Sequence, residues 1–403
     1  MQAIHESGFF GDLHESTFRR RATAAGSELP AEYASTLVPL SITLAESGEA
    51  YTYSIRDGRL ELTPGAERAV TRVELSRASF EGLTRDVESS AGLIYGARVR
   101  ALRGNLMDFM QWEPALRWLY TGRPVYDPSA VDLRGLHGEP LDPTQAFHLD
   151  DDREEMAHYL RTVGYVFVRD VLSQDEIETL RAESENLRRL AKEGDQESWW
   201  GKRSDGSSVL CRVLRAGSQP KMRALHADPR LWQLAGLCDE PMHLPIAADE
   251  KDGVTLLWKQ PGVEEGLGDL PWHRDCGLGG HGSMCPTAVV SVFLGPNTPE
   301  AGELRFLPGS WKSSFPHQTA DSPKAPRGVA PPARAGDATI HYGDGLHVAP
   351  PPTGTNGPFR SCILLGFARR GGGHHEGGRH YNDVLLGDEV GQIPDMGKAA
   401  ARR

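Results

Sequence analysis

Residues 254–260 read VTLLWKQ, and four further short segments have the same character: TAVVSVFL (287–294), GELRFLPG (302–309), DATIHYG (337–343) and FRSCILLGFA (359–368). Each is rich in β-branched and other apolar residues and is bounded by Gly or Pro turns. No helical pattern separates them, so they do not alternate with helices as the strands of a parallel α/β sheet do. The pattern predicts an antiparallel barrel or jelly roll.

The sequence ahead of these segments predicts one more strand and a helix. YVFVRDVL (165–172) begins with an apolar run that is typical of a buried strand. Ser173 and Glu176 then stand at the spacing of a capping box, which marks the start of a helix. The predicted helix has an apolar face formed by Ile177, Leu180, Leu187 and Leu190. These elements extend the barrel region back to about residue 148.

The first 125 residues have a different pattern. YTYSIRDGRLELTPG (51–65) alternates apolar and polar residues around Asp57-Gly58, which predicts a β-hairpin with a two-residue turn. AVTRVELS (69–76) alternates again and predicts a third strand, and helices are expected over 79–87 and 106–119. The apolar stripe of the second helix is interpreted either as core or as the lining of a lipid-sized cavity.

Composition divides the chain of 403 residues into four parts. Residues 126–147 are rich in Pro, Gly and Asp and predict a linker, and the Gly/His-rich stretch 371–403 predicts a mobile tail. The small domain, 1–125, precedes the linker, and the barrel region, 148–370, lies between the linker and the tail. The expected fold class is therefore α+β with two domains.

Composition also excludes several classes of function. Lys and Arg number 44 against 55 Asp and Glu, a net charge of −11, which argues against nucleic-acid binding. No apolar run approaches the ~18 residues of a membrane helix, and the first residues lack the apolar core of a signal peptide. The five cysteines are scattered and form no CxxC, so we expect reduced thiols and a cytoplasmic protein. The oligomeric state stays open.

The residues that carry chemistry begin at Trp272-His273-Arg274-Asp275. If this segment is a strand, His273 and Asp275 point to the same side. One imidazole from the distal segment, His341 or His347, would complete two histidines and one carboxylate. Such a facial triad suits Fe(II) and oxygen chemistry. Arg360 opens the last strand, where its guanidinium can pair with a carboxylate in bidentate fashion.

This ordered set of motifs resembles the phytanoyl-CoA dioxygenase family over about residues 148–370. The resemblance rests on GYVFVRDVLSQDEIETLRAE, LLWKQPG, PWHRD, AGELRFLPGSWK and the closing Gly336-Asp337, His347 and Phe359-Arg360. It implies a double-stranded β-helix (jelly-roll) core with flanking helices, and the cofactors Fe(II), 2-oxoglutarate and O2.

The resemblance also implies roles for particular residues. His273, Asp275 and His347 match the iron ligands, with His347 favoured over His341 by its distance from Gly336-Asp337. Arg360 matches the arginine that binds the distal carboxylate of 2-oxoglutarate. Thr255 matches a cosubstrate contact, and Arg212 an upstream basic contact.

Residues of about 30–125 resemble a sterol carrier protein type 2 domain, a small α/β fold with an apolar tunnel. The cues are YTYSIRDGRLELTPG, AVTRVELS, SFEGL and GARVRALRGNLMDFM. The resemblance implies either delivery of an apolar substrate or a structural module whose tunnel is closed. Delivery predicts a small apolar substrate such as a lipid, terpenoid or polyketide.

Two weaker patterns are set aside. Gly277 to Gly282 matches GxGxxG but precedes no predicted helix, so it indicates a loop, with His281 in it and Cys276 and Cys285 beside it, and not a dinucleotide site. His374, His375 and His380 are interpreted as solvated tail residues.

Three hypotheses of function remain. The first is an Fe(II)/2-oxoglutarate-dependent dioxygenase that hydroxylates a C–H bond. The alternative is a non-catalytic lipid carrier whose barrel only binds. The third is a zinc or manganese hydrolase or isomerase that uses the same ligands.

Overall fold

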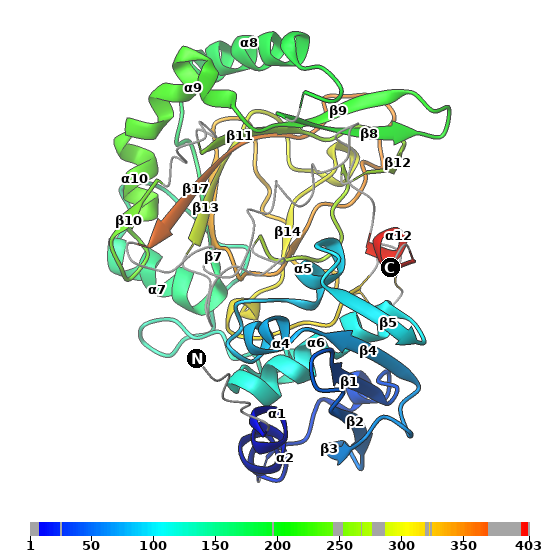
Figure 1. Cartoon of the computed structure of the whole chain (residues 1–403). Coiled ribbons are helices and arrows are strands. Elements are labelled where there is room, and N and C mark those ends of the chain that lie inside the picture. Colours follow the sequence, from blue (N-terminus) through cyan, green and yellow to red (C-terminus); the bar gives the residue numbers. More distant parts are fainter. Residues whose placement is uncertain are drawn as a thin grey trace, which may run out of the picture.

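The computed structural model describes residues 8–24, 26–195, 197–244, 253–266, 268–275, 287–318, 322, 325–369 and 396–401. Figure 1 shows two bodies: a small N-terminal one in blue and cyan below, and a larger one in green to orange above. Within these ranges, no helix combines the length and the apolarity that crossing a bilayer would require.

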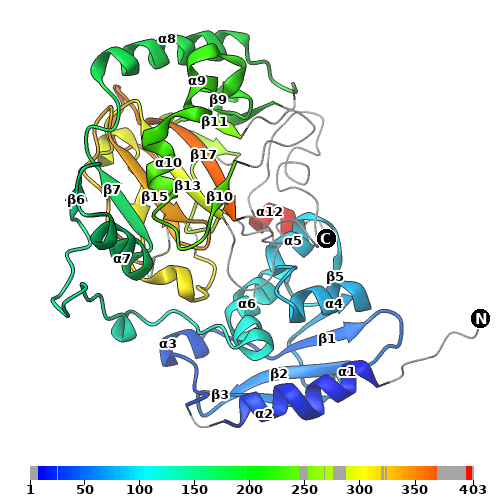
Figure 2. The same ribbon diagram turned by 90° about the vertical axis from the view of Figure 1, so that its left-hand side faces the viewer.

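The N-terminal body is a five-stranded sheet with helices. Its strands are β1 (Leu40–Leu44), β2 (Ala50–Arg56), β3 (Arg59–Pro64), β4 (Thr71–Leu75) and β5 (Val99–Arg103), in the order β3-β2-β1-β4-β5. Only the pair β1 and β4 is parallel among its ladders. The helical segments are α1 (Phe9–Asp12), the π-helical η1 (Leu13–Phe18), α2 (Arg19–Ala22), α3 (Ala31–Ala34), α4 (Arg77–Thr84), α5 (Ser90–Tyr95) and α6 (Leu106–Thr121). Helices α4, α5 and α6 lie between this sheet and the larger body (Figure 2).

The predicted hairpin is confirmed. Strands β2 and β3 pair in antiparallel register around Asp57 and Gly58, whose φ angles are 50° and 75°. Both residues thus lie in the left-handed region, as a tight hairpin turn with two positive φ values requires. Glycine adopts this conformation without strain, and aspartate tolerates it better than most residues.

The larger body is built on an antiparallel sheet, as the short segments predict. Its strands are β6 (Ala146–Phe147), β7 (Tyr165–Val168), β8 (Ser198–Arg203), β9 (Ser208–Val213), β10 (Met242–His243), β11 (Val254–Trp258), β12 (Val263–Glu265), β13 (Thr287–Phe293), β15 (Ala338–Tyr342) and β17 (Ser361–Arg369). The order is β12-β8-β9-β11-β17-β13-β15-β7-β6, with β10 beside β17. Among the described strands of this sheet, only β6 pairs in parallel, with β7.

A second, two-stranded sheet packs on the inner face of the large one. It consists of β14 (Arg305–Phe306) and β16 (His347–Val348). The Phe306 ring stacks on Tyr165 of β7, with ring centroids 4.5 Å apart. This contact joins the small sheet to the inner face of the large one.

Helices cover the outside of the large sheet (Figures 1 and 2). They are α7 (Arg153–Val163), α8 (Gln174–Leu190), α9 (Pro220–Ala224) and α10 (Pro229–Ala235). The predicted capping box is confirmed: Ser173 accepts from the Glu176 amide, and the Glu176 carboxylate accepts from the Ser173 amide. Ile177, Leu180 and Leu187 of α8 are buried in the apolar core of the larger body, whereas Leu190 is exposed.

The expectation of a mobile tail is wrong for residues 396–401. They form helix α12 (Met396–Ala401), which lies beside α5 in Figure 1. Ala399 and Ala400 are buried in the core of the N-terminal body. The last described helix of the chain therefore packs its buried face against the first domain, while Lys398 on it pairs with Glu265 of β12 at 3.2 Å.

Candidate metal centre

The main chain itself brings two of the predicted ligands together. His273 and His347 form an isolated antiparallel bridge in which each amide donates to the other residue's carbonyl at 3.0 Å. The Asp275 amide donates to the carbonyl of Gly343 at 3.0 Å, which ties the same segment to the end of β15. The expected strand at 272–275 is thus reduced to a single bridged residue, but its partner is the segment that carries the distal histidine.

The side chains of His273, Asp275 and His347 form one compact group, with ligand atoms all within 4.8 Å of one another. The Nε2 atom of His347 lies 3.6 Å from Oδ1 of Asp275. The Nδ1 atoms of the two histidines are occupied elsewhere: that of His273 lies 2.7 Å from the Pro271 carbonyl, and that of His347 lies 3.0 Å from the Gly345 carbonyl. A carbonyl partner requires the proton on Nδ1, so Nε2 keeps its lone pair for a metal.

The charges of the group also suit a metal. Burial lowers the pKa of both His273 and His347, so their rings are neutral at pH 7. For Asp275, burial alone would raise the pKa, but His347 and His341 outweigh it and the net shift is downward. Two neutral imidazoles and one carboxylate are the protonation states that ligation needs.

His341 of β15 supports the carboxylate. Its Nε2 lies 3.0 Å from Oδ2 of Asp275, on the oxygen that does not face His347. Its ring is buried, and its Nδ1 has no hydrogen-bond partner in the described structure. His341 is therefore placed to orient Asp275, while His347 completes the compact group. From the sequence, His341 was an alternative third ligand, and the position of His341 in the sequence gave no sign of its contact with Asp275.

Arg360 stands directly before β17 and is buried. Its Nε donates to the Gly302 carbonyl at 2.7 Å, and Nη1 lies 3.4 Å from Sγ of Cys362. Lys259 lies close by, because its amide donates to the Arg360 carbonyl at 2.8 Å. Burial lowers the pKa of Lys259 to about 8, although Asp269 is its ion-pair partner. Sequence reasoning missed Lys259, because lysine on a strand is ordinarily exposed.

Strand register shows where Thr255 and Arg212 lie. Residues paired across strands, and residues two apart in one strand, share a face of the sheet. From His341 the register gives one continuous row: His341, Thr339, Ser291, Leu364, Thr255, Leu257 and Arg212. Since His341 contacts Asp275, this row is the inner face. The Arg212 guanidinium lies over the Trp199 ring, 4.3 Å from its centroid.

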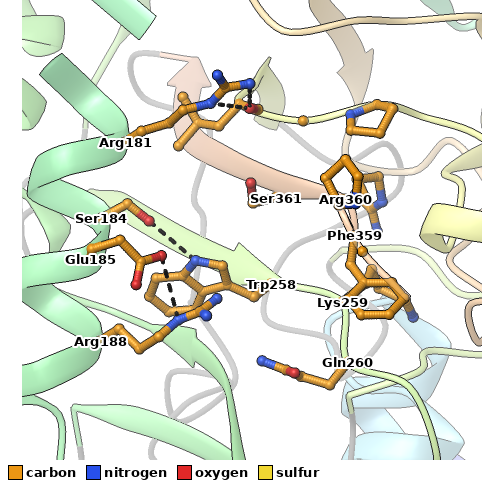
Figure 3. Close-up of a pocket in the computed structure, with 15 residues that line it drawn as sticks. Arg181, Ser184, Glu185, Arg188, Trp258, Lys259, Gln260, Phe359, Arg360 and Ser361 are labelled. Atoms are coloured by element: carbon orange, nitrogen blue, oxygen red, sulfur yellow. Dashed lines mark hydrogen bonds and ion pairs between the residues drawn. The ribbon is translucent and has the colours of Figure 1, made fainter. Parts of the chain in front are cut away.

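A cavity of about 540 Å³ lies elsewhere, between α8 and the start of β17. Figure 3 shows Trp258 at its centre, with Ser184 accepting from the indole Nε1 and Arg188 beside the ring. Arg360 and Lys259 contribute to its lining, but His273, Asp275 and His347 do not. The Arg188 side chain is already engaged by Glu185 and Trp258. The cavity therefore does not mark the metal centre.

Comparison with family models now adds an independent observation. Residues 160–361 match the model described as phytanoyl-CoA dioxygenase. The chain belongs to the phytanoyl-CoA dioxygenase family. The resemblance expected from the motifs is confirmed for this region, and the family's cofactors are Fe(II) and 2-oxoglutarate, with O2 as the oxidant. The donor set of His273, Asp275 and His347, with both Nε2 atoms left unprotonated, fits Fe(II).

Three solved structures illustrate what this phytanoyl-CoA dioxygenase family member is similar to. AviO1 from Streptomyces viridochromogenes is 24% identical, with 55% of this chain and 96% of that chain covered and a TM-score of 0.42. The carbocyclase SnoK from nogalamycin biosynthesis is 21% identical, with 56% and 87% covered and a TM-score of 0.43. EctD from S. alaskensis with bound Fe is 22% identical, with 60% and 85% covered and a TM-score of 0.43. Comparison with curated proteins gives no significant match.

Several sequence signals lie outside the described residues. They are the loop from Gly277 to Gly282 with His281, the flanking Cys276 and Cys285, and the tail residues His374, His375 and His380.

Proposed function

We propose that the protein is an Fe(II)- and 2-oxoglutarate-dependent dioxygenase that hydroxylates a C–H bond of a small organic substrate. Its family supports the oxygenase class and the cofactors. The observation that carries the assignment of ligands is the compact group of His273, Asp275 and His347, in which backbone carbonyls hold both Nδ1 atoms. This arrangement leaves three donor atoms on one side and favours a metal that keeps open positions.

In this proposal His273, Asp275 and His347 hold the iron. When bound, the iron supplies activation of O2 coupled to oxidation of 2-oxoglutarate. The protein contributes the geometry: the main-chain bridge fixes the two imidazoles, and His341 fixes the carboxylate. Preorganised ligands of this kind need no rearrangement when metal arrives.

Arg360 is proposed to bind the distal carboxylate of 2-oxoglutarate. Its guanidinium is buried beside Cys362, next to the inner-face row that contains Thr255 and Arg212. A buried guanidinium that already donates through Nε to the Gly302 carbonyl is held in one orientation, which favours pairing with a planar carboxylate. Thr255 and Arg212 are proposed as further contacts for the cosubstrate.

Hydroxylation is proposed over halogenation because of Asp275. Halogenases of this architecture lack the carboxylate ligand, and chloride takes its position. Here the Asp275 carboxylate faces His347 and is held by His341. Product from reactions that contain chloride should therefore gain oxygen and not chlorine, which mass spectrometry distinguishes.

The N-terminal domain, with its resemblance to a sterol carrier protein type 2 domain, is proposed to be structural. Its interior is filled by aromatic rings: Tyr53, Phe80 and Trp112 are fully buried. His14 lies 2.6 Å from the Tyr53 hydroxyl, which lies 3.0 Å from that of Tyr120. This packing supports a closed interior over a tunnel that delivers lipid. The apolar substrate was predicted on the assumption that this domain delivers lipid, so the apolar character of the substrate stays a prediction.

Anaerobic titration tests the proposal. Addition of Fe(II) and 2-oxoglutarate should produce a weak visible charge-transfer band, and Asp275→Ala should abolish it. A lipid carrier would bind no Fe(II), and a zinc or manganese hydrolase would give no such band. With oxygen admitted, succinate formation that depends on one member of a panel of lipids and natural products would then identify the substrate class.

A further inference from the structure

Six charged side chains of alternating sign link the N-terminal domain to the two segments that carry the metal ligands. Asp86 lies 2.6 Å from Arg117, and Arg117 lies 3.9 Å from Glu113 of the same helix, α6. The Glu113 carboxylate lies 3.3 Å from the guanidinium of Arg274, in the other domain. From there Arg274 reaches Asp344 at 3.2 Å, and Asp344 reaches Arg123 at 3.0 Å.

The positions of two members tie this charge chain to the metal ligands. Arg274 stands between His273 and Asp275, and Asp344 stands in the short loop that leads from β15 to His347. The pair of Arg274 and Asp344 therefore links the segment of the first two ligands to that of the third. The amide of Asp275, which donates to Gly343, forms a main-chain bond between the same two segments.

The charge chain is buried along its whole length, since none of its six side chains is more than 15% exposed. A charge in such surroundings is costly unless a partner of opposite sign compensates it. Arg274 has two partners, Asp344 from its own domain and Glu113 from the other. Only the docked N-terminal domain supplies the second one, so docking and the position of Arg274 are linked.

Other contacts fix the docking independently of this charge chain. The main chain of Val125 bridges to Ser314, and the Tyr126 amide donates to the Ser314 carbonyl at 2.8 Å. Gln111 of α6 donates to the His317 carbonyl at 2.9 Å. On the other side, Glu113 is held by the Ser90 amide at 2.7 Å, at the start of α5. Glu113 thus enters the interface from a rigid element.

We propose that Glu113 is a positioning residue of the metal centre. By pairing with Arg274, it holds the segment of His273 and Asp275 against that of His347, and the N-terminal domain becomes part of the iron site without touching the metal. The inference rests on the proposed function for the identity of the ligands. It assigns the first domain a role that is neither delivery of substrate nor burial of apolar surface alone.

The proposed role of Glu113 is tested by comparing the metal affinities of three variants of the full chain with that of the unsubstituted protein. Glu113→Gln keeps the size of the side chain and an acceptor for the Ser90 amide, but removes the charge that Arg274 needs. Gln111→Ala is the matched control, because it removes a contact between the domains from the same helix outside the charge chain. Glu113→Asp keeps the charge on a shorter side chain. Binding is followed with Fe(II) plus 2-oxoglutarate by the charge-transfer band and with Co(II) alone by its visible spectrum.

Glu113→Gln should raise the dissociation constant for both metals about 10- to 100-fold, as loss of an orienting partner around a metal site typically does. Gln111→Ala should change it less than twofold, and Glu113→Asp should fall between. If Glu113→Gln binds both metals as tightly as the unsubstituted protein, the proposal is overturned. A lowered melting temperature of metal-free Glu113→Gln would then show that the contact is structural only. If Glu113→Gln does not fold, an affinity of Glu113→Asp equal to that of Gln111→Ala would overturn it. Failure of the unsubstituted protein to bind either metal would instead overturn the proposed function, and this inference with it.

Discussion

The main chains of His273 and His347 are hydrogen-bonded to each other in both directions, each bond being 3.0 Å long. Two side chains that are far apart in the sequence are therefore fixed by a backbone bridge before any metal binds. The Nε2 atoms then need only the rotamers that the carbonyls of Pro271 and Gly345 already select.

Loss of any one ligand should abolish Fe(II) binding. In His273→Ala, Asp275→Ala or His347→Ala, only two donors remain in the group, and a site with three protein ligands has none to spare. Circular dichroism should show a folded protein, and Fe(II) titration should show no saturable binding. His148→Ala, at an exposed histidine, is the control and should bind normally. Ordinary affinity in any of the three variants would remove that residue from the ligand set.

Replacement of His341 should weaken metal binding without abolishing it. His341→Ala leaves all three ligands in place but frees Oδ2 of Asp275. Orienting partners of metal ligands are typically worth 10- to 100-fold in affinity, so we expect an increase of about that size in the dissociation constant. If His341→Ala abolishes binding while His347→Ala retains it, the two histidines have the opposite roles.

Arg360→Ala should raise the 2-oxoglutarate requirement sharply. A buried charge-assisted contact that is lost costs roughly 2–4 kcal/mol, or about 30- to 1000-fold in affinity. The measurement is the 2-oxoglutarate dependence of the charge-transfer band at saturating Fe(II). Arg369→Ala, at the other end of β17 and paired with Glu240, is the matched control. An unchanged requirement in Arg360→Ala would shift the assignment to Arg212 or Lys259.

His14 should make the stability of the metal-free protein depend on pH. Burial lowers the pKa of His14 to about 4, against a reference value of 6.5. Between about pH 4 and 6.5 the His14 ring is therefore protonated in the unfolded chain but neutral in the folded one. The free energy of unfolding falls as pH drops below about 6.5. From this shift we expect the free energy of unfolding to be about 2 kcal/mol lower at pH 5 than at pH 7.5 on account of His14.

Denaturant unfolding of the unsubstituted chain and of His14→Gln at the two pH values measures how much of the pH dependence comes from His14. The difference between pH 7.5 and pH 5 should shrink in His14→Gln, whereas His148→Gln should leave it unchanged because that ring is exposed. A difference of the same size in all three proteins would show that His14 carries none of it.

Local patterns predicted much of the fold. The alternation around Asp57-Gly58 predicted the hairpin of β2 and β3, and the pair of Ser173 and Glu176 predicted the start of α8. Both signals work because the groups that interact are neighbours in the sequence, so the bond forms whatever the rest of the chain does. The positions of β11, β13, β15 and β17 followed from short apolar runs between turn residues, although their pairing partners are distant in the sequence.

Other elements were not predictable in this way. Helix α12 has six residues, too few to be stable alone, and exists because Ala399 and Ala400 are buried against the first domain. Strand β6 lies in the predicted linker and owes its structure to pairing with β7. In each case the stabilising partner is distant in sequence, and composition carries no record of it.

For the site, the sequence by itself determined the residue types: two histidines and an aspartate that can serve a metal, and an arginine ahead of the last strand. The tertiary structure alone brought His341 to Asp275, Lys259 to Arg360, and Glu113 to Arg274. The physical reason is that the ability to ligate a metal is a property of a single side chain and is known from the residue type. Orientation of a ligand by a neighbouring group requires two side chains to meet. In a buried interface, the pairing of charges is decided only when the two domains dock.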